Sequence, residues 1–150
     1  MKKTLLIVAL IFGAAMTIVG LRLPRPDSQA SALGPAEVVE AFYGDYLSYI
    51  GDGEMMRNPL TDGMYRRSPY LAGSLVAQVD TLVAGFERGG FDPFLMAQDV
   101  PDEVTAGEAT VMGKAAAVAV TTSFAGHRFT VSLEQQADGR WLMTAITPGM

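Results

Sequence analysis

The spacing of apolar residues changes near Val104, and this change constrains the fold more than any other feature of the sequence. Before Val104, apolar residues recur every three or four positions, which is typical of helices that bury one face. After it they alternate with smaller or polar residues, which is typical of strands with one buried face. Helical segments followed by a run of strands predict an α+β domain with an antiparallel sheet.

Two helices are predicted before this change. The first runs from Pro35 to about Ile50, because proline suits the first turn of a helix and a glycine follows at position 51. The second runs from Pro69 or Ala72 to about Arg88, with Ser68 as a possible N-cap. The prediction allows two to three helices in all.

Four strands are predicted after the change, separated by short turns that contain glycine. The Asp138–Gly139 pair is a strong hairpin signal, because both of its positions favour positive φ. The expected fold is therefore a four-stranded antiparallel meander with two to three N-terminal helices packed on it. The predicted strands are 104–112, 115–124, 128–136 and 141–147.

The N-terminus has the pattern of an export signal. Lys2 and Lys3 precede an uncharged apolar run from Thr4 to Gly20, close to the length that spans a bilayer. Residues 1–23 are predicted to be a signal anchor or a signal peptide, 24–34 a linker, and 35–150 the domain. We favour an anchor through residues 4–20 with the domain outside the cytoplasm, because the small residues at 30–32 lie far beyond the run. The alternative is a secreted or periplasmic protein after cleavage.

Charge and composition exclude several classes of function. Without Lys2, Lys3, Arg22, Arg25 and Asp27, the chain keeps 7 basic and 15 acidic residues, a net charge of −8. Nucleic acid is therefore not expected as a partner, since phosphate binding needs clustered Lys and Arg. The chain has no cysteine and one histidine, His127, so thiolate and multi-histidine metal sites are excluded. No cofactor, metal or catalytic constellation is predicted, and His127 is expected to be an exposed turn residue.

The region from Asn58 to Pro101 holds seven of the eight candidate ligand-binding residues, and Tyr46 of the first predicted helix is the eighth. The region interleaves aromatic, charged and turn-forming side chains, as segments that line a pocket often do. Each candidate also has a structural explanation: aspartates near proline suit turn capping, tyrosines suit a core, and an arginine readily pairs with an acid. The candidates are Tyr46, Tyr65, Arg66, Tyr70, Asp80, Asp92, Gln98 and Asp99.

Several elements resemble a bacterial family named domain of unknown function 3828. They are Phe42-Tyr43, Asn58-Pro59-Leu60, Ser68-Pro69-Tyr70-Leu71, Val79-Asp80, Asp92-Pro93-Phe94, Gly126-His127 and Asp138-Gly139-Arg140-Trp141. The match runs from about Pro35 to Thr147. The resemblance implies an exported envelope protein with a cone-like fold similar to that of nuclear transport factor 2 or cystatin. It implies no catalytic residues, and the chain lacks the cysteine needed for lipid attachment.

Three functions are compatible with these observations. The first is a membrane-tethered, non-enzymatic domain that binds a small molecule, a peptide or an envelope protein. The second is an isomerase or hydrolase that uses a buried aspartate with a tyrosine donor. The third is an inhibitory or immunity-type envelope protein that acts through an acidic surface.

Overall fold

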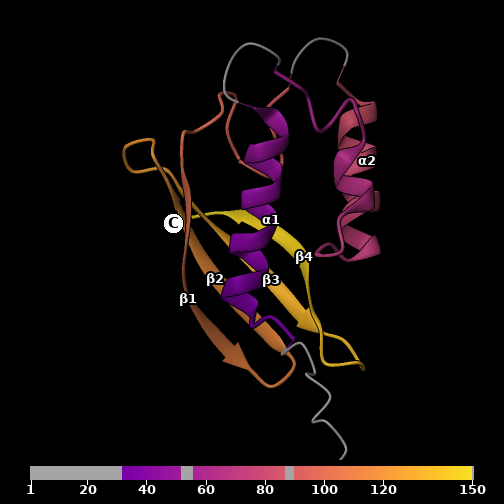
Figure 1. Cartoon of the computed structure of the whole chain (residues 1–150), viewed down its shortest axis with the longest axis vertical. Coiled ribbons are helices and arrows are strands. Elements are labelled where there is room, and N and C mark those ends of the chain that lie inside the picture. The colour runs from indigo at the N-terminus through magenta and orange to yellow at the C-terminus, as the bar shows by residue number, and fades with distance from the viewer. Residues whose placement is uncertain (1–31, 52–55, 87–89, 150) are drawn as a thin grey trace, which may run out of the picture.

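Two helices lie on one face of a four-stranded antiparallel sheet (Figure 1), which confirms the predicted α+β class. The computed structural model of the chain describes residues 32–51, 56–86 and 90–149. The elements in chain order are α1 (Pro35–Ile50), the 3₁₀ helix η1 (Met64–Arg67), α2 (Gly73–Ala84), β1 (Val104–Met112), β2 (Ala115–Thr122), β3 (Arg128–Gln135) and β4 (Trp141–Pro148).

The sheet is a meander with strand order β1-β2-β3-β4, as the alternating pattern predicted. The hairpin between β3 and β4 turns at Gly139, whose φ of 86° is in the left-handed region that glycine adopts at little cost. β1 contains a bulge between Ala106 and Ala109. The bulge adds a residue to β1 and bends the strand at the edge of the sheet.

The core lies between α1 and the inner face of the sheet. The predicted stripe of α1 is buried, including Val39, Phe42 and Tyr46. On the sheet, directly opposed residues such as Val118 and Val131 share the inner face and are fully buried. The outer face carries mostly small or polar side chains, with Met112 and Leu142 as apolar exceptions, and no helix of the described chain covers it. Removal of the inner apolar surface from water is the main force that holds the helices on this face.

The start of α2 corrects one prediction. The helix begins at Gly73 with Ala72 as its N-cap, so Ser68 is not the cap and Pro69 is not in the helix. The reason is pairing with β4, because the Ala72 N–H donates to the Met143 carbonyl (2.9 Å) and the Met143 N–H donates to the Tyr70 carbonyl (2.8 Å). These bonds hold the chain extended through Leu71, and helical geometry would break them.

The predicted signal segment lies outside the described residues, together with most of the linker. Among the residues that the structure describes, no helix has the length and hydropathy to cross a bilayer.

Candidate binding site

Asp92 organises the loop between α2 and β1. Its Oδ1 accepts the backbone N–H groups of Phe94 (2.8 Å) and Leu95 (3.1 Å), which is the turn that an aspartate before proline favours. Its Oδ2 accepts the Tyr46 hydroxyl of α1 at 2.7 Å. All three hydrogen bonds come from the protein itself, so the geometry gives Asp92 a structural role.

Phe94 fixes the same loop to the core. The side chain is fully buried, and its ring lies 5.1 to 5.6 Å from the rings of Phe42, Tyr46 and Tyr65. The Phe94 carbonyl accepts the buried Tyr43 hydroxyl at 2.7 Å. The loop is therefore attached to α1 by aromatic packing and by two tyrosine hydroxyls.

His127 holds the loop from the side of the sheet, and its position corrects a prediction. The ring is half-buried against Phe124 and Phe129, whereas the sequence suggested an exposed turn residue. Nε2 lies 3.0 Å from the Met96 carbonyl and Nδ1 lies 3.0 Å from the Thr122 hydroxyl. The Met96 carbonyl belongs to this loop, and the sequence pattern gave no indication that it lies beside the His127 ring.

Burial shifts the acid–base properties of this network. The pKa of Asp92 is raised because burial disfavours the charged carboxylate, although hydrogen bonds from Tyr46, Leu95 and Phe94 oppose the shift. The pKa values of Tyr46 and Tyr43 are also raised, first by burial and then by the negative charge of Asp92. Both tyrosines therefore stay protonated and act as donors.

The raised pKa of Asp92 predicts a specific pH dependence of stability. A group with a raised folded-state pKa contributes most below its unfolded pKa and loses that contribution as the pH rises through the folded pKa. The unfolding free energy of wild type minus that of Asp92→Asn should therefore decrease as the pH rises from about 4 to 7. Urea denaturation at each pH measures this difference. The control is Asp80→Asn: because the pKa of Asp80 is lowered, the same difference should increase with pH below about pH 4 and stay nearly constant from about pH 4 to 7. Equal slopes for both variants would refute the assignment.

Asp80 forms a second cluster at the surface. Its Oδ1 accepts the Tyr65 hydroxyl and also the Arg66 Nε, the latter at 2.8 Å. These two hydrogen bonds, with the one from Tyr65 the larger cause, lower the pKa of Asp80. The side chains of Arg66 and Asp80 are 52% and 41% exposed, so this ion pair is a surface contact and not the wall of a cavity.

The structure thus divides the eight predicted site residues. Tyr46–Asp92 and Tyr65–Arg66–Asp80 form two hydrogen-bonded clusters, and the rings of Tyr46 and Tyr65 both contact the ring of Phe94. Asp92, Gln98 and Asp99 line a shallow hollow of about 310 Å³, in which Gln98 and Asp99 are exposed. The Tyr70 backbone pairs with β4, away from this hollow. None of the hollows described for residues 32–51, 56–86 and 90–149 collects all eight.

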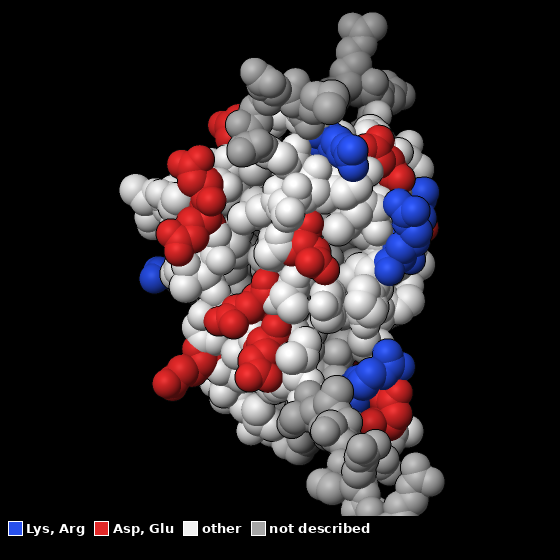
Figure 2. Space-filling view, viewed as in Figure 1, with Lys and Arg blue, Asp and Glu red and all other residues white. Residues whose placement is uncertain are grey.

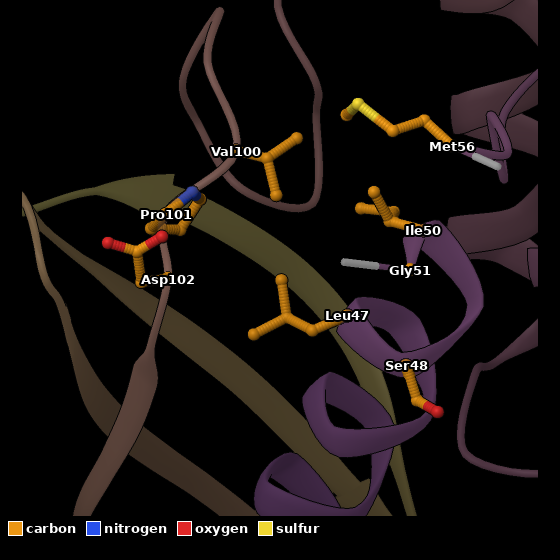
Figure 3. Close-up of a pocket in the computed structure, with 8 residues that line it drawn as sticks. All are labelled: Leu47, Ser48, Ile50, Gly51, Met56, Val100, Pro101 and Asp102. Atoms are coloured by element: carbon orange, nitrogen blue, oxygen red, sulfur yellow. The ribbon is translucent and has the colours of Figure 1, made fainter. Parts of the chain in front are cut away.

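A groove between α1 and β1 is the more extensive concave feature. We call it the α1–β1 groove. Its upper part has a volume of about 670 Å³, and its lower part, of about 300 Å³, shares Leu47 and Asp102 with it. In Figure 3, Leu47 and Ile50 of α1 face Val100 and Pro101 across the upper part, whereas Ser48 points away. Residues that line the two parts are Glu40, Tyr43, Gly44, Leu47, Ser48, Ile50, Gly51, Met56, Val100, Pro101, Asp102, Glu103, Val104, Thr105 and Ala106.

The groove has an apolar floor and an acidic rim, which we define as Glu40, Asp102 and Glu103. All three rim residues are exposed, and no Lys or Arg lines either part of the groove. In the described part of the chain the ion pairs are Arg66–Asp80 and Arg140–Asp138, so the rim charges are not neutralised there. Figure 2 shows acidic side chains gathered over α1 and β1, with most Lys and Arg toward the side of α2.

Sequence reasoning did not identify the groove. Most of its residues come from α1 and from the segment that leads into and begins β1, about 55 positions apart, and neither has a motif of its own. The available signal was the excess of acidic residues, which the charge count detected without placing it. Within residues 32–51, 56–86 and 90–149, no group of three or more Asp, Glu or His side chains could hold a metal ion.

Comparison with known proteins adds a structural likeness. The sequence matches no protein-family model, and a search of curated proteins finds no significant match. Among solved structures, the chain is similar to one in the crystal structure of the type VI native effector-immunity complex Tae3-Tai3 from Ralstonia pickettii. The TM-score is 0.60 with 22% sequence identity, over 78% of this chain and 96% of that chain. At this identity the likeness shows a shared fold.

Proposed function

We propose that this protein is a non-enzymatic binding domain whose partner is a protein with a basic surface. The observation that carries this proposal is the α1–β1 groove, which combines an apolar floor with three unneutralised carboxylates. Apolar area contributes affinity, and a single-sign rim steers and selects a partner of opposite charge. The net charge of −8 that remains without Lys2, Lys3, Arg22, Arg25 and Asp27 also favours a basic partner.

We further propose an inhibitory, immunity-type role in the cell envelope. The similar structure comes from an effector-immunity complex, so this fold occurs in an assembly of that kind. Its identity of 22% carries no residue-level role to this chain, and the proposal rests on the groove. The resemblance to the exported family and the predicted anchor support an extracytoplasmic location. The cone-like fold that this resemblance implies stays a prediction.

Binding of a small molecule and enzymatic action are weaker alternatives. The enzymatic alternative requires a buried aspartate within hydrogen-bond distance of a tyrosine, and the Tyr46 hydroxyl lies 2.7 Å from Asp92 Oδ2. However, the oxygens of Asp92 already accept three hydrogen bonds from the protein, and its hollow is small and open to solvent at Gln98 and Asp99. A catalytic role would require a substrate group to displace one of those bonds.

Affinity capture from the native envelope tests the proposal. The full-length protein is recovered from the membrane fraction, which also tests the predicted anchor, and its bound proteins are compared with those of Glu40→Gln/Asp102→Asn. We expect one reproducible basic partner that is depleted on the rim variant. If the protein is inhibitory, adding it to the purified partner should reduce the activity of that partner.

The matched control is Asp62→Asn/Glu134→Gln, which removes the same charge at two exposed positions outside the groove. Equal capture by the control and the rim variant would show that the groove does not bind the partner. Recovery of the full-length chain only in the soluble fraction would contradict the anchor.

A further inference from the structure

The two edges of the sheet differ in a way that bears on how a partner binds. The edge of β4 is covered where Tyr70 and Ala72 hydrogen-bond with Met143. β1 pairs only with β2 among the described strands, so its other edge is free. A free edge presents unpaired backbone donors and acceptors to any extended chain that approaches it.

The register identifies which backbone groups face this edge. The Ser123 N–H donates to the Glu103 carbonyl (3.0 Å), which marks these opposed residues as a hydrogen-bonded pair. Such pairs alternate with non-hydrogen-bonded pairs in an antiparallel ladder. Val104, opposite Thr122, and Ala106, opposite Val120, therefore belong to the second kind. Their N–H and C=O groups point away from β2, toward the free edge.

Val104 and Ala106 are also residues of the α1–β1 groove. The groove continues from them to Tyr43, Gly44 and Leu47 of α1, so a helix runs beside the free edge. This pairing of an exposed strand edge with a neighbouring helix is the geometry by which strand-addition domains bind extended peptides. Main-chain hydrogen bonds give the affinity in such sites, and pockets for alternate side chains give the specificity.

The rest of the edge is less suited to pairing. After Ala106 the register is broken by the bulge at Gly107 and Glu108. A bulge and a charged residue on an edge strand are devices that discourage pairing with another chain. Regular pairing resumes from Ala109 to Met112, but of the two regular segments only Glu103 to Ala106 borders the groove.

We propose that an extended, basic segment of the partner protein adds to β1 as a fifth strand beside Val104 and Ala106. Alternate apolar side chains of that segment face Tyr43 and Leu47, and its Lys or Arg residues meet the acidic rim. This inference rests on the proposed function and specifies its mode. Charge selects the partner at the rim, and the backbone of β1 fixes its register.

Amide exchange with a defined probe tests the inference. The probe is a blocked nine-residue peptide of alternating valine and lysine, added to the isotope-labelled full-length protein. At saturation we expect exchange of the Val104 and Ala106 amides to slow by about tenfold or more. The same peptide with glutamate in place of lysine, or with every backbone amide N-methylated, should give no protection. Protection elsewhere, or none with the lysine peptide, would overturn the proposal.

A variant provides a second, independent test. Ala106→Pro removes the edge-facing N–H, and proline is tolerated in an edge strand where that group faces solvent. We expect this variant to lose peptide binding while it keeps the wild-type unfolding midpoint. Retained binding would overturn the inference. If Ala106→Pro does not fold, the exchange experiment on wild-type protein decides.

The two proposals can fail separately. A partner that is captured through the acidic rim, but leaves the Val104 and Ala106 amides unprotected, would support the binding function and reject strand addition. Capture that the rim variant Glu40→Gln/Asp102→Asn does not reduce would reject the binding function itself.

Discussion

Replacement of Phe94 by alanine is expected to lower the unfolding free energy by about 3–5 kcal/mol, the usual cost of truncating a buried phenylalanine. The side chain is fully buried and contacts the rings of Phe42, Tyr46 and Tyr65. Its loss would leave a cavity between α1 and the loop that borders the groove. Urea denaturation followed by the fluorescence of Trp141, the only tryptophan, measures the change.

The control is a second phenylalanine of the same loop. Phe91 is 40% exposed, so Phe91→Ala should change the unfolding free energy by less than about 1 kcal/mol. Equal effects of the two substitutions would show that Phe94 does not anchor the loop.

Loss of the Tyr43 hydroxyl should have the next largest effect. Tyr43→Phe keeps the ring but leaves the Phe94 carbonyl buried without its donor, at a cost of about 1–3 kcal/mol. The denaturant midpoint should fall while the slope of the transition stays constant, because the surface exposed on unfolding is unchanged.

Tyr49→Phe is the matched control. The Tyr49 hydroxyl donates to Asp62 at 3.1 Å in an exposed position, where water can replace the bond. We expect a change within about 0.5 kcal/mol. A larger loss for Tyr49→Phe than for Tyr43→Phe would contradict the description of the loop.

The sequence predicted the regular elements well because local pattern determines them. α1 and all four strands begin at the predicted residues, because the spacing of apolar residues changes where one helix or strand ends and the next begins. Of the two predicted starts of α2, Pro69 was wrong and Ala72 was close, because pairing of Tyr70 and Ala72 with β4 outweighs the local preference of Ser68 and Pro69 for a helix start. That pairing joins positions far apart in the chain.

The candidate site was harder to predict for the same reason. The pairing of Asp92 with Phe94 is local, and turn capping was recognised as one of its possible roles. The bond from Tyr46 to Asp92 spans 46 positions, and the groove joins Leu47 to Asp102. Such contacts depend on how α1 lies against the sheet, and residue spacing does not contain that information. Charge was visible in the sequence, but its location was not.

The affinity of the captured partner for the full-length protein and its variants tests the central claim most directly. Two exposed ion pairs at about 0.2–1 kcal/mol each correspond to a two- to thirtyfold change in Kd. We predict that Glu40→Gln/Asp102→Asn raises the Kd within that range and flattens its dependence on salt, whereas Asp62→Asn/Glu134→Gln leaves both unchanged. Equal effects of the two double variants, or no effect of either, would contradict the claim that the α1–β1 groove binds the partner.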